Sequence, residues 1–253
     1  METVSAAPPR SLDVRASLRQ CFFAIAGGIM LLMTLWGFRA YYLRGLGAGD
    51  VEIAPTMVRL AAVHGGALTA WIVLFLAQTV LVASNRRYWH RVLGWGALAV
   101  AFAVCMSGLL VAVRSVQAAP GFVFWGMDYR QFLLIMLVEI ATFACFVVLA
   151  VLHRKRPQRH RAMMLMATLS ILAGATVRMP GLAEYFGDSG WSGIFGPVAL
   201  LGFVFLALRS LIDGRLDRWM AGGLVGMTAV YFLAVSAATS SAWGSIAASL
   251  FGV

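Results

Sequence analysis

The sequence predicts an all-α polytopic membrane protein with about seven transmembrane helices. Hydrophobic residues make up 61% of its 253 residues and charged residues only 12%, and the apolar residues gather in long runs. A soluble domain carries roughly 25% charged residues, so a soluble fold of this length cannot bury so much apolar surface. A lipid bilayer can accept it. Although the net charge is +10, we therefore expect a bilayer and not nucleic acid as the partner of this basic chain.

Each of seven apolar runs is long enough to span the bilayer, which takes about 17–25 helical residues. The expected spans are 20–42, 57–83, 92–113, 131–152, 162–179, 192–212 and 219–240. We expect a four-helix core made of the second to fifth spans. We also expect residues 1–18 to form an N-terminal cytoplasmic tail and residues 19–253 a single transmembrane helical domain.

The distribution of cationic residues predicts the orientation. If the N-terminus is cytoplasmic, 14 of the 20 Lys and Arg residues fall in inside segments and 6 in outside segments. An excess of cations on the cytoplasmic side is typical of membrane proteins. We therefore expect a multi-pass protein of the bacterial cell inner membrane, with a cytoplasmic N-terminus and an extracytoplasmic C-terminus.

Ionisable side chains inside the spans are the first candidates for a functional site, because they are costly in a bilayer. His64 lies in the outer half of the second span. Glu139 lies in the fourth, about 12 Å from its outer end by helix rise, and Arg178 lies near the outer end of the fifth. We expect these three residues to form an outer polar layer, with His64 and Glu139 as candidate catalytic residues. A purely structural hydrogen bond between His64 and Glu139 is the alternative.

A second polar layer is expected on the cytoplasmic side. His64, Trp71 and Gln78 are spaced by seven residues and share one helix face, which leads from the outer layer to the inner one. His90 begins the third span and His160 the fifth, at the same membrane depth. We expect these two histidines to approach each other and treat them as candidate metal ligands. The alternative is that they are interfacial residues reaching toward the membrane surface.

Small side chains continue above His90 on one face of the third span. They are Gly94, Ala97, Ala101, Cys105 and Gly108. Close helix–helix packing is the simpler interpretation of such a stripe. A flat cofactor lying against the helix is the alternative.

Three stretches stand out as short motifs. They are His64-Gly65 with Trp71 and Gln78, residues 90–95 (His-Arg-Val-Leu-Gly-Trp), and residues 156–164 followed by Arg178. Together they resemble an uncharacterised family of multi-pass bacterial membrane proteins, known only as a domain of unknown function. The resemblance covers about residues 57–180. It implies the membrane fold and carries no chemistry with it.

The histidines resemble, more weakly, those of b-type transmembrane cytochromes, in which a four-helix core ligates haem. That resemblance implies one haem between His90 and His160. His64 has no histidine partner in the outer layer, so a second bis-histidine haem is not implied. The other residues expected to bind the cofactor are Gln78, Trp71, Arg91 and Arg178.

The leading functional expectation is a membrane redox protein that holds one b-type haem and exchanges electrons with a quinone near His64 and Glu139. A proton-coupled transporter or channel that uses the same two residues is the first alternative. A non-catalytic helper subunit of a larger membrane complex is the second. The sequence contains no Walker loop, GxSxG or HExxH motif, so it gives no support to a nucleotide-binding enzyme or a hydrolase of those classes.

Overall fold

The computed structural model describes residues 14–47, 51–119 and 122–251. Most of the expected tail, up to residue 13, lies outside the described residues. The helices are α1 (Val14–Gly37), α2 (Arg39–Arg44), α3 (Pro55–Ala83), α4 (Arg87–Ala118), α5 (Tyr129–Leu152), α6 (Pro157–Ser170), α7 (Ala173–Thr176), α8 (Leu182–Phe186), α9 (Gly190–Asp213), α10 (Arg218–Ala238) and α11 (Ser241–Phe251). The strands β1 (Val123–Phe124) and β2 (Met127–Asp128) form a short antiparallel hairpin.

Six helices of the described ranges are long and apolar enough to cross a membrane: α1, α3, α4, α5, α9 and α10. The chain is therefore an all-α, multi-pass membrane protein, as the sequence predicts. Large apolar side chains point outward from these helices; Trp95, for example, is 77% exposed and Phe102 67%. Such a surface is unfavourable in water and suits the acyl chains of a bilayer.

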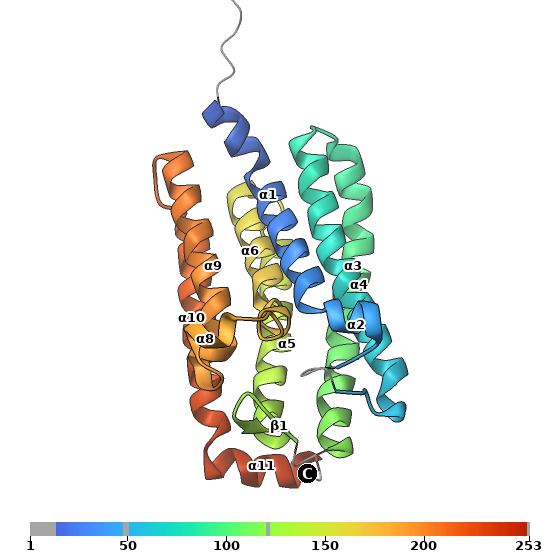
Figure 1. Ribbon diagram of the computed structural model, residues 1–253. Coiled ribbons are helices and arrows are strands. Elements are labelled where there is room, and N and C mark those ends of the chain that lie inside the picture. Colours follow the sequence, from blue (N-terminus) through green and yellow to red (C-terminus); the bar gives the residue numbers. More distant parts are fainter. Residues whose placement is uncertain (1–13, 48–50, 120–121, 252–253) are drawn as a thin grey trace, which may run out of the picture.

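The long helices run up and down a single bundle (Figure 1). The described chain starts with α1 at one end of this bundle, and α11 lies across the opposite end. In sequence order, α3 packs on α4, α4 on α5 and α5 on α6, while α6 makes a lighter contact back to α3. α1 covers α3, and α10 packs on α5, α6 and α9. α6 is the innermost of these helices, since Leu165, Met166 and Leu169 are fully buried.

The fifth expected span, 162–179, is not one continuous helix. α6 ends at Ser170 and the short α7 follows, so no single helix in this region has the length of a span. The Ser170 hydroxyl donates to the backbone carbonyl of Ala167, and the Tyr231 hydroxyl donates to the Ser170 carbonyl at 2.8 Å. These side-chain hydrogen bonds satisfy backbone carbonyls that the next turn of a continuous helix would otherwise have bonded. Irregular backbone at membrane depth is tolerated only where protein surrounds it, and α6 and α7 are surrounded.

Local sequence explains where several helices begin. Asp128 and Gln131 form a capping box at the start of α5, each bonding the other's backbone N–H. Asp217 accepts from two backbone N–H groups at the start of α10. Pro55 and Pro157 occupy the first turns of α3 and α6, where a missing N–H costs nothing. These caps set the registers of the helices that carry the polar side chains.

The end of the bundle at which α1 begins is held by arginines. Arg15 and Arg19 donate to the Ile212 carbonyl in the last turn of α9, at 2.8 and 3.1 Å. Arg209 is 2% exposed and pairs with Asp213 at 2.8 Å. Cations that bond the last carbonyls of a helix stabilise its C-terminus. α1 is thereby fixed to α9 on the side of the bundle where His90 and His160 lie.

Candidate functional site

The predicted approach of His90 and His160 is confirmed. His90 lies in the first turn of α4 and His160 in the first turn of α6. Their ring centres are 6.3 Å apart and their planes meet at 81°. Helix direction explains this contact, because α4 and α6 both begin at the same end of the bundle. We call these two residues the inner histidine pair.

The hydrogen bonds of the inner histidine pair leave one ring nitrogen of each residue without a partner. The Nδ1–H of His160 donates to the Ala150 carbonyl at 2.9 Å, so its Nε2 carries a free lone pair. Within the described residues, Nδ1 of His90 and Oε1 of Gln78 are buried and have no hydrogen-bond partner. Buried polar atoms without partners are rare in proteins and mark a missing water, ion or ligand. Two of them lie in the inner layer.

The inner histidine pair has the donors and the spacing for one metal ion. Two imidazoles that ligate a metal from opposite sides at about 2 Å place their ring centres roughly 6 Å apart. The Nδ1–H bond of His160 to a backbone carbonyl is the support that metal-ligating histidines usually have. Gly94 leaves room beside the pair, since a Cβ added there meets only Nε2 of Gln78, at 3.8 Å. These residues therefore fit a metal-centred planar group.

The other residues expected to bind the cofactor are placed differently. Trp71 is 1% exposed and lies deeper in the bundle, where it meets the Phe143 ring edge to face at 4.9 Å and donates to Thr168. Arg91 is exposed at the surface of α4. Arg178 lies beyond the end of α6, where its guanidinium is over the ring of Phe124 in β1, close to the start of α5, and so it belongs to the outer layer.

His64 has a partner that the sequence analysis did not identify. Its Nδ1 lies 3.0 Å from Oγ of Ser107 on α4. The Ser107 hydroxyl donates to the Ala103 carbonyl at 2.6 Å, so the His64 Nδ1–H is the donor in the first bond. A Cβ added at Gly108 would lie 3.3 Å from the His64 ring. His64 is therefore held between α3 and α4, and its Nε2 is left as an acceptor.

Glu139 faces the interior of the bundle. Ile135 and Phe143, one turn before and after it on the same face of α5, are fully buried. In the part of the chain that the structure describes, its carboxylate makes no hydrogen bond and no ion pair, including none to His64.

Arg178 and Tyr231 are the charged and polar neighbours of Glu139. Each has a Coulombic interaction with Glu139, and neither is in hydrogen-bond contact with it. The Arg178 guanidinium lies over the Phe38 ring at 4.9 Å and over the Phe124 ring at 5.5 Å, and it donates to the Gly174 carbonyl. We call Glu139, Arg178 and Tyr231 the outer polar cluster. It lies beside the break between α6 and α7.

Ser107 and Tyr231 are the functional candidates that sequence reasoning missed. Tyr231 is 2% exposed and stacks on Phe195 with ring centres 4.1 Å apart. A lone tyrosine in the middle of an apolar span was a signal for it, because its hydroxyl needs a partner there. Ser107 gave a weaker signal, since a serine within a membrane helix can bond its own backbone.

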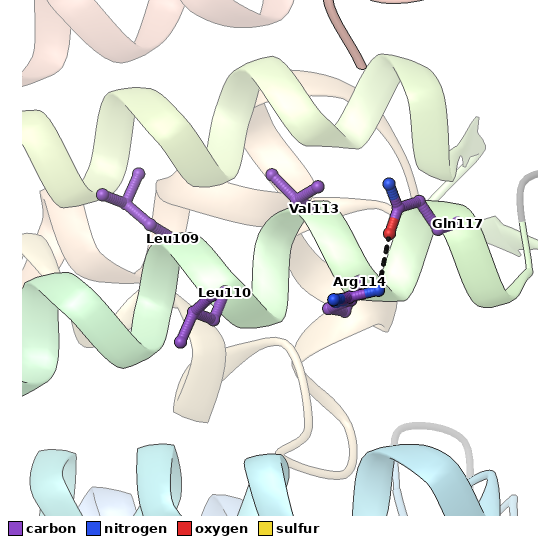
Figure 2. A pocket seen from close by; sticks show the side chains of 5 residues that line it. All are labelled: Leu109, Leu110, Val113, Arg114 and Gln117. Carbon is purple, nitrogen blue, oxygen red and sulfur yellow. Dashed lines mark hydrogen bonds between the residues drawn. The ribbon is translucent and has the colours of Figure 1, made fainter. Parts of the chain in front are cut away.

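Figure 2 shows a hollow that belongs to none of these sites. It lies along α4, where the Arg114 guanidinium donates to the Gln117 amide oxygen at 3.4 Å. Leu110, on the same stretch of α4, is 52% exposed, so the hollow lies on the outer surface of the bundle. A second hollow lies near the other end of α4, beside Trp89. Neither is lined by a histidine or a glutamate.

No group of three or more His, Cys, Asp or Glu side chains that could hold a metal ion gathers within residues 14–47, 51–119 and 122–251. The inner histidine pair supplies two donors, which is the number that a planar tetradentate ligand leaves open on an octahedral iron. Comparison of the chain with family models, curated proteins and solved structures found no match. The function is therefore inferred from the geometry of the inner histidine pair and the outer polar cluster.

Proposed function

We propose that this protein is a membrane electron carrier in which His90 and His160 ligate one b-type haem. The separation of 6.3 Å between their ring centres is the observation that carries the proposal. The bond from His160 to Ala150 supports it, because it orients the ring and leaves Nε2 for the iron. Bound haem would supply one-electron chemistry at a potential set by its axial ligands and burial.

The proposed core consists of α3, α4, α5 and α6. Each packs on the next and α6 returns to α3, so α4 and α6 are opposite members of a ring. A haem between His90 and His160 would thus lie inside the ring, as in the b-type cytochromes that the histidines resemble. Gly94 leaves room for its edge. Arg91 and Arg161, which follow the two histidines in sequence, are suited to pair with the haem carboxylates.

The proposed topology has seven crossings, of which the fifth is made by the broken segment from α6 to α8. An odd count puts the two ends on opposite sides of the proposed bacterial inner membrane, and the excess of cations in the inside segments favours a cytoplasmic N-terminus and an extracytoplasmic C-terminus. It also places the inner histidine pair toward the cytoplasm. Reporter tags at the two ends test it, and labelling of both ends from the same side would exclude an odd number of crossings.

The haem proposal is tested by the colour of the protein. Protein produced with ample haem and purified in mild detergent should show a Soret band that shifts on reduction. His90→Ala and His160→Ala should each abolish or shift the band. His153→Ala is the matched control, because His153 bonds Leu149 within its own helix and should leave the band unchanged. A colourless wild-type protein, or a band that survives both substitutions unchanged, would overturn the proposal.

A proton-coupled transporter is the second candidate, and Glu139 is the observation that favours it. An interior carboxylate without a direct partner is the kind of group that takes up and releases protons in transport. Such a protein would be colourless, and in liposomes it would move protons in a way that Glu139→Gln abolishes. A helper subunit would instead copurify with a stoichiometric partner after gentle extraction.

A further inference from the structure

We infer that the loop between α5 and α6, together with the start of α10, binds the head group of an anionic phospholipid. The cations of this site are Arg154, Lys155, Arg156 and Arg159, and its aromatic member is Trp219; we call these residues the basic loop site. It lies at the end of the bundle at which α1 begins (Figure 1). The inference is independent of the proposed function, because no proposed haem ligand belongs to the site.

The contact between Arg159 and Trp219 gives the site its geometry. The guanidinium carbon of Arg159 lies over the Trp219 ring, 4.0 Å from the ring centre. The ring of His153, at the end of α5, lies 5.9 Å from the same indole, so the loop packs against the start of α10. In the described structure the Arg159 guanidinium makes no hydrogen bond and no ion pair. A guanidinium over an aromatic ring keeps its N–H donors in its own plane, where they can bind a phosphate.

The positive charge of the site has no counterpart in this part of the protein. No Asp or Glu occurs from residue 140 to residue 183. Within the described ranges, the two carboxylates at this end of the bundle belong to the turn between α9 and α10, and both are engaged. Asp213 pairs with Arg209, and Asp217 accepts from backbone N–H groups at the start of α10. Neighbouring like charges repel each other, so an anion from outside the chain stabilises the loop.

Apolar surface beside the cations favours a lipid over a dissolved anion. Leu152, in the last turn of α5, is 69% exposed, and Leu216, just before α10, is 57% exposed. Trp219 itself is 40% exposed. Free phosphate would leave this surface in water, whereas a phospholipid that binds the cations through its phosphodiester would cover it with acyl chains. Clusters of four or more cations next to the end of a spanning helix are typical binding sites for anionic head groups.

The usual excess of cations on one side of a membrane protein explains the charge of the loop but not its arrangement. Arg87, at the start of α4, is an exposed cation at the same end of the bundle. It lies over no aromatic ring among the described residues, whereas Arg159 lies over Trp219. A comparison of Arg87 with Arg159 therefore separates a built site from the general effect of charge.

Native mass spectrometry of the full-length protein in detergent, titrated with dioleoylphosphatidylglycerol or dioleoylphosphatidylcholine, tests the inference. The wild type should bind the anionic lipid about tenfold more tightly or better, since several cations contribute. Arg159→Gln should weaken phosphatidylglycerol binding about fivefold, the effect of one cation at an anionic surface. Trp219→Leu changes no charge and should also weaken it, because Arg159 loses the ring that positions it. Arg87→Gln is the matched control and should bind as the wild type does.

Three results would overturn the inference. One is equal affinity of the wild type for the two lipids. Another is an equal loss in Arg159→Gln and Arg87→Gln with wild-type binding in Trp219→Leu, since only the total charge would then matter. The third is displacement of phosphatidylglycerol by inorganic phosphate but not by chloride at the same ionic strength, which would show a site for a dissolved anion.

Thermal melting in detergent checks that the variants fold. Should Arg159→Gln melt below the wild type, Arg154→Gln and Lys155→Gln replace it, because both side chains are exposed in the loop. Each should weaken phosphatidylglycerol binding and leave phosphatidylcholine binding unchanged. Wild-type affinity for phosphatidylglycerol in both replacements would overturn the inference.

Discussion

The inner histidine pair and the outer polar cluster both place polar side chains inside a membrane bundle, and they differ in how these side chains are arranged. The inner pair consists of two histidines, one in the first turn of α4 and one in the first turn of α6, whose ring centres lie 6.3 Å apart. The outer cluster consists of a carboxyl group, a guanidinium and a phenol beside the break between α6 and α7. Two matched donors suit a permanently bound ion, whereas an interior carboxyl group without a direct partner suits a proton that is taken up and released.

The packing of α1 against α7, beside the outer polar cluster, can be tested at Gly37. A Cβ at this position would collide with the Ala175 backbone in α7, because α1 packs directly on that segment. Gly37→Ala should lower the free energy of unfolding by about 3 kcal/mol, at the upper end of the range for overpacking, because backbone cannot move aside easily. Chemical or thermal unfolding in detergent measures it.

Gly28→Ala is the control, in the same helix with nothing within 4 Å of the added Cβ. The variant should be as stable as the wild type or slightly more, since alanine favours a helix. Equal destabilisation by both substitutions would show that α1 does not depend on close contact with α7.

The room beside the inner histidine pair can be tested at Gly94. Gly94→Leu should fill the space next to Gln78 and lower haem affinity about tenfold. Haem titration monitored at the Soret band measures the change. Gly96→Leu is the matched control, because Gly96 is exposed and has nothing within 4 Å. Equal affinities in the two variants would place the cofactor elsewhere.

The smallest effect is expected at His64, which belongs to neither region. Ser107→Ala removes the acceptor of its Nδ1–H and should cost about 1 kcal/mol of stability, the usual value for one hydrogen bond. Haem content should stay at the wild-type level. A loss of haem from Ser107→Ala would show that His64 contributes to the inner site.

Much of the fold follows from the bilayer itself. Six of the expected spans are realised as long helices because a membrane requires long apolar runs, and these are visible in any sequence. The break after Ser170 was not predictable, since no proline or glycine lies at it. It depends on Tyr231, which is 61 residues away in the chain. Contacts of that kind follow from the packing of whole helices.

For the candidate sites, too, one part of the geometry could be predicted from the sequence and another part could not. Helix rise and alternating direction set the depth of a residue, so the contact of His90 with His160 could be predicted. Rotation of a helix about its axis depends on its neighbours, and it decides which partner a side chain meets. His64 was therefore expected near Glu139, and it bonds Ser107 on α4. The layer was predictable and the pairing within it was not.

Electron paramagnetic resonance of the oxidised, haem-containing protein tests the central claim most directly. The planes of His90 and His160 meet at 81°, and nearly perpendicular imidazoles on a low-spin ferric haem give a strongly anisotropic signal. We expect that signal in the wild type, its loss in His160→Ala, and its retention in His153→Ala. A high-spin signal in the wild type, or the rhombic signal of parallel imidazoles, would contradict ligation by these two side chains in the geometry described.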